Sequence, residues 1–387
     1  MKIIHTSDWH LGHMLYGYDR SMEQNSMIDQ MVDLVGSHRP DAFIVSGDIF
    51  HTSSPSNHAQ SMLAEGLMRI RSASPATTII VTAGNHDSGA RLEVFRTPWK
   101  ALGVHVVGQY YRDDLQQHII VIDGKGFVIA LPYINEFFIT DGLYETLQNM
   151  VADRNKAGLP VVMMAHTTVT GCDISWHSNS NEYSAGGINS QPLESFGNGY
   201  DYLALGHIHK PQRLSPKAFY CGTPLPIGFD EEGDHGALLV EIPKHGDTPT
   251  VTPLPIENPL PLKTLPEPDS CPAPQTWDNV RQLFEAFPDG DECYIRLNVK
   301  VDNSGFIPAS AAQTAAHIAE KKQCRFCHIN PIRETANNSA DKRQLNVDEF
   351  RQEKPIDILA RYLHDKNIVF DNDMHEVFDE VLRNLNI

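Results

Sequence analysis

The chain contains 387 residues, of which 41% are hydrophobic and 21% are charged, values that are typical of a folded globular protein and exclude a disordered chain. Its length exceeds what one hydrophobic core usually supports, which predicts one large domain with smaller additions. The formal net charge of −18 disfavours nucleic-acid binding through overall charge, although bound divalent ions, a local basic face or a basic partner can override it.

An α/β domain is predicted for the part of the chain up to Ile242. Short β-branched runs alternate there with amphipathic segments, including helical periods at Met27, Met31 and Val35 and at Met62 and Leu67. The expected strands are Lys2–Thr6, Ala42–Ser46, Thr78–Thr82, Gly103–Val107, Ile119–Ile122, Phe127–Leu131, Val161–Ala165, Tyr202–Leu205 and Ala237–Ile242.

The remainder of the chain divides into three further segments. The stretch from Pro243 to Pro274 is rich in proline and is typical of an extended linker. A small αβ domain follows, with expected strands at Tyr294–Val301 and Phe326–Ile332 and a helix at Ala309–Lys322. Two amphipathic helices are expected from Val347 onward, and their apolar stripes need a surface to cover them. The predicted boundaries are 1–245, 246–274, 275–344 and 345–387.

The cellular compartment is predicted from what the sequence lacks. No segment approaches the roughly 20 apolar residues that span a bilayer. Met1 leads directly into a short apolar run and Asp8, which leaves no room for a secretory signal. The six cysteines show no disulfide framework and are expected to be free thiols. We therefore expect a cytoplasmic protein without a membrane segment.

Polar residues gather where the predicted strands end. The strand ends carry Asp8 and His10 as D-x-H, Gly47-Asp48, Gly84-Asn85-His86-Asp87, His166, and His207 and His209 as H-x-H. An open α/β sheet binds its ligands at this edge. Residues two apart on an extended segment point to the same side and can approach one ion together.

The residue types in this pattern indicate a transition-metal site. Imidazole and carboxylate ligands together suit Mn, Fe or Zn better than Mg, which prefers oxygen. A single H-x-H or Gly-Asp is more often an ordinary turn than a ligand, because turns are rich in Gly, Asp and Asn. Five such elements at successive strand ends favour the metal site, and a pair of Mn ions is the first expectation.

The ordered set D-x-H, G-D, G-N-H-D, H and G-H-x-H resembles the calcineurin-like metallophosphoesterase superfamily. The opening I-I-H-T-S-D-W-H-L-G, the string Gly47-Asp48-Ile49-Phe50-His51, the string Cys221-Gly222-Thr223-Pro224 and Phe229-Asp230-Glu231 are similar to those of the prokaryotic double-strand-break repair nucleases. The resemblance implies a four-layer α/β/β/α sandwich with a small αβ cap domain and a C-terminal helical tail.

The resemblance also implies a role for each residue at the strand ends. One ion would be held by Asp8, His10, Asp48 and His209, and the other by Asp48, Asn85, His166 and His207, so that Asp48 bridges them. His86 resembles the family's catalytic imidazole, which contacts the phosphate and can protonate the leaving oxygen. Asp87 is expected to orient the ring of His86. His51 is either a second phosphate-facing imidazole or a solvent-facing loop residue.

The partners implied by the resemblance are DNA, an SMC-type ATPase and a second copy of the chain. The family acts as a three-prime-to-five-prime exonuclease on duplex ends and as an endonuclease on single strands and hairpins. No P-loop of the form G-x-x-x-x-G-K-[ST] occurs here, so any ATP dependence must come from another chain. The expected dimer helices carry residues that fit an intramolecular core equally well, namely Met62, Leu63, Leu67, Ile70, Leu92, Val94, Phe95 and Trp99.

The predicted cap is locally basic within an acidic chain. Lys321, Lys322 and Arg325 belong to this region, which would follow the DNA backbone beside the active site or form an ordinary solvated face. The C-x-x-C-H string at Cys324–His328 matches covalent haem attachment. We discount it, because that chemistry needs an export route.

Two other functions remain open from the residues alone. The same metal site can hydrolyse a small phosphodiester or a phosphoprotein, and a non-catalytic scaffold can keep the fold and bind a partner through its tail. The basic cap and the amphipathic tail argue against a small-molecule phosphodiesterase. No ligand of the pattern is missing, which argues against the scaffold.

Overall fold

Two six-stranded sheets form the main body of the protein. The computed structural model describes residues 1–177, 190–267, 275–301 and 307–333. The first sheet has the strand order β16-β15-β1-β4-β5-β6, with a parallel centre and two antiparallel strands at one end. Its strands are β1 (Lys2–Thr6), β4 (Ala42–Ser46), β5 (Thr78–Thr82), β6 (Val104–Val107), β15 (Gly236–Glu241) and β16 (Thr250–Pro255).

The second sheet has the order β13-β14-β12-β9-β8-β7 and is parallel except at its two edge strands. Its strands are β7 (Ile119–Ile122), β8 (Gly126–Ala130), β9 (Val161–His166), β12 (Tyr202–Gly206), β13 (Gln212–Arg213) and β14 (Ala218–Tyr220). Every strand predicted for this part of the chain is found: β1, β4, β5 and β7 keep the predicted bounds, and the other five differ by one residue at one or both ends.

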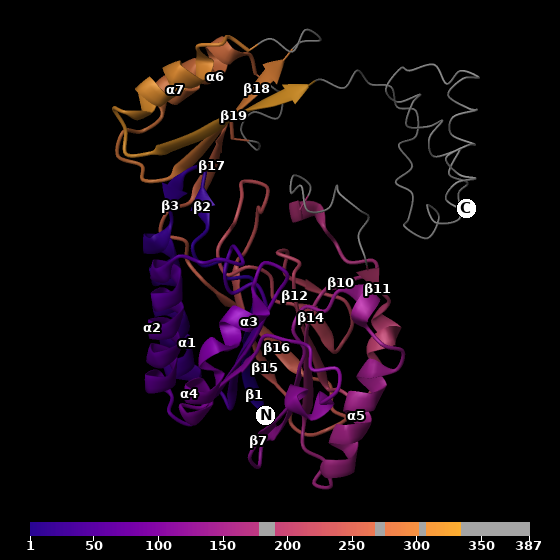
Figure 1. Cartoon of the computed structure of the whole chain (residues 1–387). Helices are drawn as coiled ribbons and strands as arrows, with labels where there is room; N and C mark the ends of the chain where they lie inside the picture. Colours follow the sequence, from indigo (N-terminus) through magenta and orange to yellow (C-terminus); the bar gives the residue numbers. More distant parts are fainter. Residues whose placement is uncertain (178–189, 268–274, 302–306, 334–387) are drawn as a thin grey trace, which may run out of the picture. The chain divides into compact units, whose positions relative to one another are not determined.

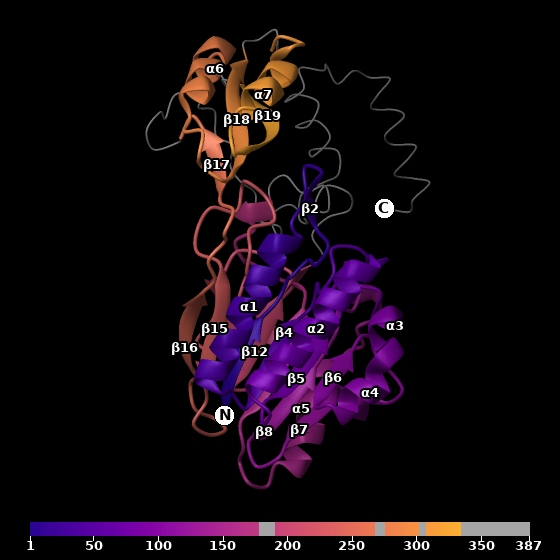
Figure 2. The same cartoon turned by 90° about the vertical axis from the view of Figure 1, so that its left-hand side faces the viewer.

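Helices cover the outer face of each sheet. The helices over the first sheet are α1 (Ser21–His38), α2 (Asn57–Ala73), α3 (Gly89–Leu92) and α4 (Arg96–Ala101), and α5 (Leu143–Arg154) covers the second. Figure 1 shows α1 and α2 on the opposite side of the body from α5, and Figure 2 shows α1 and α2 in front of the first sheet. The predicted helical period of α1 is buried at Met27, Met31 and Val35. The Ser56 hydroxyl begins α2 by accepting from the Ala59 backbone N–H at 3.1 Å.

Three buried clusters account for the layers. Ile4, Phe43 and Val81 of the first sheet pack against α1 and α2, whereas the alternate residues Ile3 and Ile44 pack against the second sheet. The other face of the second sheet packs on α5. Because strand side chains alternate between the faces, each sheet is buried on both sides. The four-layer α/β/β/α arrangement implied by the resemblance is confirmed.

The cap is a parallel sheet of three strands with two helices. Its elements are β17 (Leu262–Leu265), β18 (Tyr294–Val301), β19 (Arg325–Arg333), α6 (Trp277–Ala286) and α7 (Ala311–Ala319). Helix α6 was not predicted. The short hairpin β2 (Met14–Leu15) and β3 (Tyr18–Asp19) of the body meets the cap where the Tyr18 hydroxyl donates to the Phe326 carbonyl at 3.1 Å. A further pair, β10 (Thr168–Val169) and β11 (Ser190–Gln191), extends the body.

The proline-rich segment after Pro243 is not a simple linker, and this prediction was wrong. Strand β16 pairs with β15 of the first sheet, and β17 pairs with β18 of the cap. Pro253 and Pro255 are tolerated because β16 is the edge strand of its sheet and needs hydrogen bonds on one side only. The body therefore continues past the predicted boundary at residue 245. The predicted tail helices at 345–387 lie outside the described residues.

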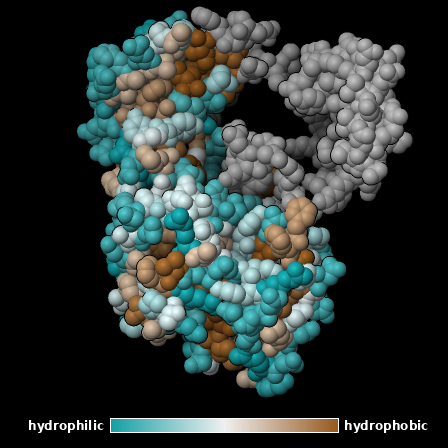
Figure 3. All heavy atoms as spheres, viewed as in Figure 1, coloured by the Kyte–Doolittle hydropathy of each residue, from teal (hydrophilic) through white to brown (hydrophobic). Residues whose placement is uncertain are grey.

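The surface that Figure 3 shows is mostly polar. The face in Figure 3 is largely hydrophilic, with hydrophobic areas that are small and separate. Among the helices that the structure describes, none combines the length and apolar character needed to span a membrane. Cys172, Cys221, Cys293, Cys324 and Cys327 are free thiols.

Candidate metal centre

The seven predicted ligands come together at the carboxyl ends of the central strands. They lie at or just after the ends of β1, β4, β5, β9 and β12 and are Asp8, His10, Asp48, Asn85, His166, His207 and His209. Asp8, His10, Asp48 and His207 have φ values of 54°, 44°, 49° and 93°. Positive φ is uncommon outside glycine, and such strain is concentrated at functional sites. The backbone is therefore bent at the points where these side chains must turn into the site.

A first donor cluster consists of Asp8, His10 and His209, whose ligand atoms lie within 4.8 Å of one another. The Nε2 atoms of His10 and His209 are 3.3 Å apart. The His209 Nδ1–H group donates to Glu231 Oε1 at 2.6 Å, which leaves its Nε2 lone pair facing the site. At this distance the two ring nitrogen atoms can approach one cation together, so the geometry fits a cation bound between the rings.

A second donor cluster consists of Asp48, His166 and His207, again within 4.8 Å. The His166 Nδ1–H group donates to the Ser46 carbonyl at 2.8 Å, so its Nε2 is the available donor atom. The Asn85 amide oxygen lies 3.0 Å from His166 Nε2 and 2.9 Å from His207 Nδ1. The four side chains present nitrogen and oxygen atoms to one point.

Asp48 lies between the two clusters. Its Oδ2 atom is 3.7 Å from His10 Nε2 of the first cluster and 3.4 Å from His166 Nε2 of the second. Its Oδ1 atom accepts the backbone N–H of His86 at 2.9 Å. Gly84 is required beside this carboxylate, since a Cβ at Gly84 would lie 2.0 Å from Asp48 Oδ1. The carboxylate is thus positioned to serve both clusters.

The electrostatics of the centre are those of buried acids among imidazoles. Burial raises the pKa of Asp8, and it lowers the pKa of His10. Burial also lowers the pKa of His166, but the adjacent Asp48 carboxylate outweighs it and raises that pKa to about 9. Burial acts to raise the pKa of Asp48. The opposing effect of the neighbouring His166 imidazole is larger, and the pKa of Asp48 lies below its ordinary value. Asp48 is therefore ionised and available as a ligand.

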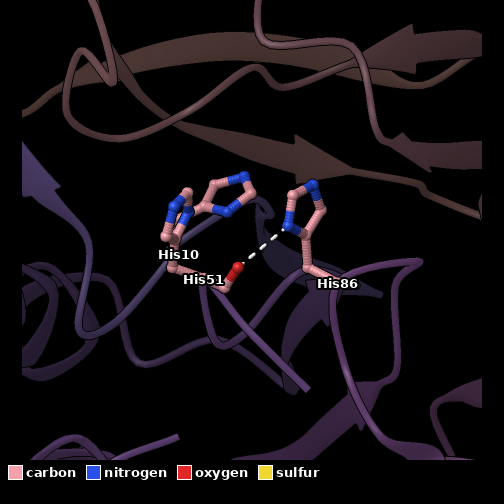
Figure 4. Close-up of side chains that lie close together, drawn as sticks. All are labelled: His10, His51 and His86. Atoms are coloured by element: carbon pink, nitrogen blue, oxygen red, sulfur yellow. Dashed lines mark hydrogen bonds between the residues drawn. The ribbon is translucent and has the colours of Figure 1, made fainter. Parts of the chain in front are cut away.

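A third group of imidazoles, His10, His51 and His86, lies beside the clusters (Figure 4). The His86 Nδ1–H group donates to the His51 carbonyl at 2.9 Å, and His86 Nε2 lies 3.9 Å from Asp48 Oδ2. The rings of His51 and His86 stack with their centroids 5.7 Å apart. His51 also packs edge-on against His13, which sequence reasoning had not singled out. Of the two alternatives for His51, the structure favours an imidazole that faces the site.

Asp87 does not orient the ring of His86, and this prediction was wrong. Its carboxylate accepts the backbone N–H groups of Gly84, Ile49 and Phe50 at 2.8, 3.0 and 2.9 Å. Burial, together with the charge of Asp48, raises the pKa of Asp87 to about 7. Asp87 therefore joins the loops after β4 and β5, and the ring of His86 is held by the His51 carbonyl instead.

Glu231 was not predicted as part of the site. It is buried and holds His209 through Oε1, while its Oε2 accepts the Ile227 backbone N–H at 2.8 Å. A carboxylate behind a metal-binding histidine fixes the tautomer and orientation of the ring. The sequence carries no spacing signal for this pair, because the contact joins two separate loops. The string Phe229-Asp230-Glu231 in the resemblance was the only hint.

Two of the three predicted DNA contacts are used within the protein. Lys322 Nζ donates to the Phe287 carbonyl at 2.6 Å and to Asp289 Oδ1 at 2.7 Å. Arg325 Nη1 donates to the Tyr294 hydroxyl at 2.6 Å, and its guanidinium lies over the Tyr18 ring. Lys321 is exposed. Of the three predicted contacts, Lys321 is therefore the exposed one.

Most of the predicted dimer residues belong to the core of this chain. Met62, Leu63, Leu67, Ile70 and Leu92 are buried in the cluster between the first sheet and its helices. Trp99 packs against the same cluster, whereas Val94 and Phe95 are exposed. Of the two alternatives weighed for the apolar stripe of α2, the structure supports the intramolecular core.

Known proteins are similar to this chain in sequence. Residues 1–211 match the family model described as Calcineurin-like phosphoesterase. The protein named as the D subunit of the SbcCD nuclease in Rhodobacter capsulatus is 32% identical over 317 residues, which cover 75% of this chain and 77% of that protein. Its namesake in Escherichia coli K12 is 30% identical, covering 60% and 62%, and that in Bacillus subtilis is 26% identical, covering 88% of both.

The family model covers more than half of the chain, and the strand-end residues that it spans are those that form both donor clusters. The match to the Rhodobacter capsulatus protein takes in a larger part of the chain than the family model does. This chain belongs to the calcineurin-like phosphoesterase family and, within it, to the family of SbcCD nuclease D subunits.

Proposed function

We propose that this chain is a DNA nuclease subunit that hydrolyses phosphodiester bonds with the help of two divalent metal ions. The observation that carries the proposal is the pair of donor clusters on either side of the Asp48 carboxylate. Two cations held in this way suit a phosphodiester, because both the attacking and the leaving oxygen atoms carry negative charge. Buried imidazoles and carboxylates alone have no evident structural use at this density.

The ligands divide between two positions. One ion would be held by Asp8, His10, Asp48 and His209 and the other by Asp48, Asn85, His166 and His207. The mixed nitrogen and oxygen donors suit Mn(II) better than Mg(II), and we propose manganese. Bound ions would polarise the phosphodiester and offset the charge that develops during hydrolysis.

His86 would act as the general acid. Its Nδ1–H is engaged with the His51 carbonyl, so Nε2 is the atom that can hold and release a proton toward the leaving oxygen. His51, stacked on the same ring, would face the phosphate as a second imidazole. Asp87 would act indirectly by fixing the backbone of the loop that carries Asn85 and His86.

DNA and an ATPase are proposed as partners. The relatives are named as D subunits of the SbcCD nuclease, which supports DNA as substrate and an SbcC-like SMC-type ATPase as partner. We propose three-prime-to-five-prime exonuclease action on duplex ends and endonuclease action on single strands and hairpins, in repair, recombination and replication. Residues 345–387, which lie outside the described residues, would dock on the ATPase. A homodimer would use the exposed Val94 and Phe95 beside α3 and α4.

The test combines metal content with DNA cleavage. The purified chain is incubated with Mn(II) and a hairpin-ended duplex, with and without EDTA, beside Asp48→Ala and His86→Ser. The proposal expects cleavage by the wild type, loss of both metal and cleavage in Asp48→Ala, and retained metal without cleavage in His86→Ser. Cleavage that survives EDTA or Asp48→Ala would refute the metal mechanism.

A second arm separates DNA from other substrates. If the wild type binds Mn(II) and hydrolyses a chromogenic phosphodiester but leaves DNA intact, an SbcC-like subunit with ATP is added. DNA cleavage in the mixture assigns the defect to the missing partner. Continued inactivity on DNA would favour a small phosphodiester substrate.

A further inference from the structure

Strand β18 of the cap presents two polar side chains to the body. Tyr294 and Arg296 alternate with Ile295 and Leu297, which are buried in the core of the cap. Because residues two apart on a strand share a face, Tyr294 and Arg296 both point toward the body. Each is buried, and each contacts a carboxylate of the body.

Tyr294 contacts the body next to a residue that supports His10. Its hydroxyl donates to Glu23 Oε1 at 2.6 Å, within the buried first turns of α1. The adjacent Gln24 donates through Nε2 to the His10 carbonyl at 3.0 Å and accepts the Gly12 N–H at 3.1 Å. Gln24 thus holds the short loop from which the His10 side chain enters the metal centre.

Arg296 contacts the body next to a residue that supports His209. Its Nη1 donates to Asp230 Oδ1 at 2.6 Å and its Nη2 to the Phe229 carbonyl at 3.2 Å. The next residue is Glu231, which orients His209 through the bond at 2.6 Å. A movement of the 229–231 backbone away from the cap would therefore carry Glu231 with it.

Both routes lead to the same donor cluster. His10 and His209 belong with Asp8, whereas His166 is held by the Ser46 carbonyl and by Asn85, which are parts of the body. We propose that Tyr294 and Arg296 of the cap are positioning residues for the metal held by Asp8, His10 and His209, and that the metal held by Asp48, His166 and His207 is independent of the cap.

This inference rests on the proposed function only in requiring that both clusters bind metal. Its physical basis is the precision that metal ligands need. A residue that orients a ligand changes metal affinity by about 10- to 100-fold when removed, and Tyr294 and Arg296 lie one contact further out. We therefore expect about a three- to tenfold weaker first site on loss of either contact, with the second site unchanged. A cap that tilts away from the body would release the same metal.

The experiment is a calorimetric Mn(II) titration of the full chain, with no DNA present. Arg296→Ala, Asp230→Asn and Tyr294→Phe are compared with Arg281→Ala, which removes an ion pair with Glu285 that lies wholly within α6. Asp230→Asn and Tyr294→Phe keep the side-chain shape, so their Mn(II) affinities can be measured even if Arg296→Ala unfolds. Thermal melting of each variant monitors the fold.

The assignment to one site uses two backgrounds. In His166→Ala, where the first site remains, Arg296→Ala or Asp230→Asn is expected to weaken Mn(II) binding about three- to tenfold. In His209→Ala, where the second site remains, the same changes are expected to have no effect. Equal weakening in both backgrounds, or none in His166→Ala, would overturn the inference. Wild-type chain that binds two ions but cuts no DNA even with an SbcC-like subunit and ATP would contradict the proposed nuclease function, and the effect of the cap variants on Mn(II) affinity would still be measurable.

Discussion

Lys322 Nζ lies 2.6 Å from the carbonyl oxygen of Phe287, the residue that follows the last turn of α6. It also donates to the Glu285 carbonyl at 3.1 Å. A cation at the C-terminus of a helix satisfies free carbonyl groups and interacts favourably with the helix dipole. Lys322, whose side chain is only 5% exposed, therefore stabilises the cap, whereas its neighbour Lys321 faces solvent.

This contrast gives a matched pair of variants for DNA binding. Lys321→Ala is expected to reduce the slope of log affinity against log salt by about one phosphate contact. Lys322→Ala is expected to keep the wild-type slope and lower the melting temperature of the cap. The measurement is a fluorescence anisotropy titration on duplex DNA at several salt concentrations, without divalent metal. A smaller slope in Lys322→Ala alone would contradict the assignment.

Metal binding is expected to raise thermal stability through the two donor clusters. A ligand that binds only the folded state stabilises it by about 2.7 kcal/mol per site at a concentration of 100 times its Kd. Mn(II) should therefore raise the melting temperature of the wild type, and EDTA should reverse the rise. Asp48→Asn should abolish most of the rise because Asp48 lies beside both clusters, while the exposed Asp113→Asn should retain it. A full rise in Asp48→Asn would exclude Asp48 as a shared ligand.

Glu231 and its neighbour Glu232 provide a second comparison. Glu231 holds His209 at 2.6 Å, whereas Glu232 is exposed. Glu231→Gln keeps the size of the side chain but removes its charge, and we expect about a 10- to 100-fold loss of Mn(II) affinity. Glu232→Gln should bind as the wild type does. The Mn(II) affinity of each variant is measured by calorimetry. Equal affinities in the two variants would show that Glu231 does not affect metal binding by His209.

Gly84 is expected to tolerate no side chain. A Cβ there would lie 2.0 Å from Asp48 Oδ1 and 2.3 Å from the Asp48 backbone nitrogen, so the loop after β4 would have to move. Gly84→Ala should lose Mn(II) binding and DNA cleavage together and should destabilise the fold by about 1–3 kcal/mol, as overpacking usually does. Gly290→Ala in the cap has open space around the new methyl group and serves as the control. Retained metal binding in Gly84→Ala would show that this loop is not rigid.

The body and its metal centre were predictable from sequence because their signals are local. Most expected strands are short apolar runs that end at or before a Gly or polar residue, and strand ends of a parallel sheet meet at one edge. Asp8, His10 and Asp48 could therefore be placed together without knowledge of tertiary structure. The partners of these residues could not, because Glu231, Ser46 and Gln24 reach the centre through contacts that no spacing encodes.

The errors also have physical causes. Proline normally ends a strand and so predicts a linker where β16 lies, yet an edge strand uses only one side for pairing. The sequence shows charge but not burial, and so predicts Lys322 and Arg325 as free cations. In the structure, Lys322 pairs with Asp289 and Arg325 donates to the Tyr294 hydroxyl. Adjacency in sequence predicts Asp87 as the partner of His86, whereas the hydrogen bonds of its carboxylate go to three backbone amides.

His5 gives a prediction for the pH dependence of stability that is independent of catalysis. It is fully buried between the sheets, with Nδ1 2.8 Å from the Tyr202 hydroxyl and Nε2 3.2 Å from the Ser46 hydroxyl. Burial lowers the pKa of His5 to about 3. In the unfolded chain an ordinary histidine has a pKa near 6.5. At a pH between these two values, His5 binds a proton in the unfolded chain but not in the folded chain.

Between pH 6.5 and about 3 the unfolded state therefore holds the extra proton, and the free energy of unfolding falls as the pH falls through this window. The contribution of one such group approaches about 1.4 kcal/mol per pH unit well below pH 6.5 and vanishes above it. Urea unfolding of metal-free wild type and His5→Gln from pH 5 to 8 measures the difference. The variant should be less stable at pH 8 through lost packing, and its deficit should shrink toward pH 5. A deficit that stays constant with pH would show that the pKa of His5 is the same in the folded and the unfolded chain.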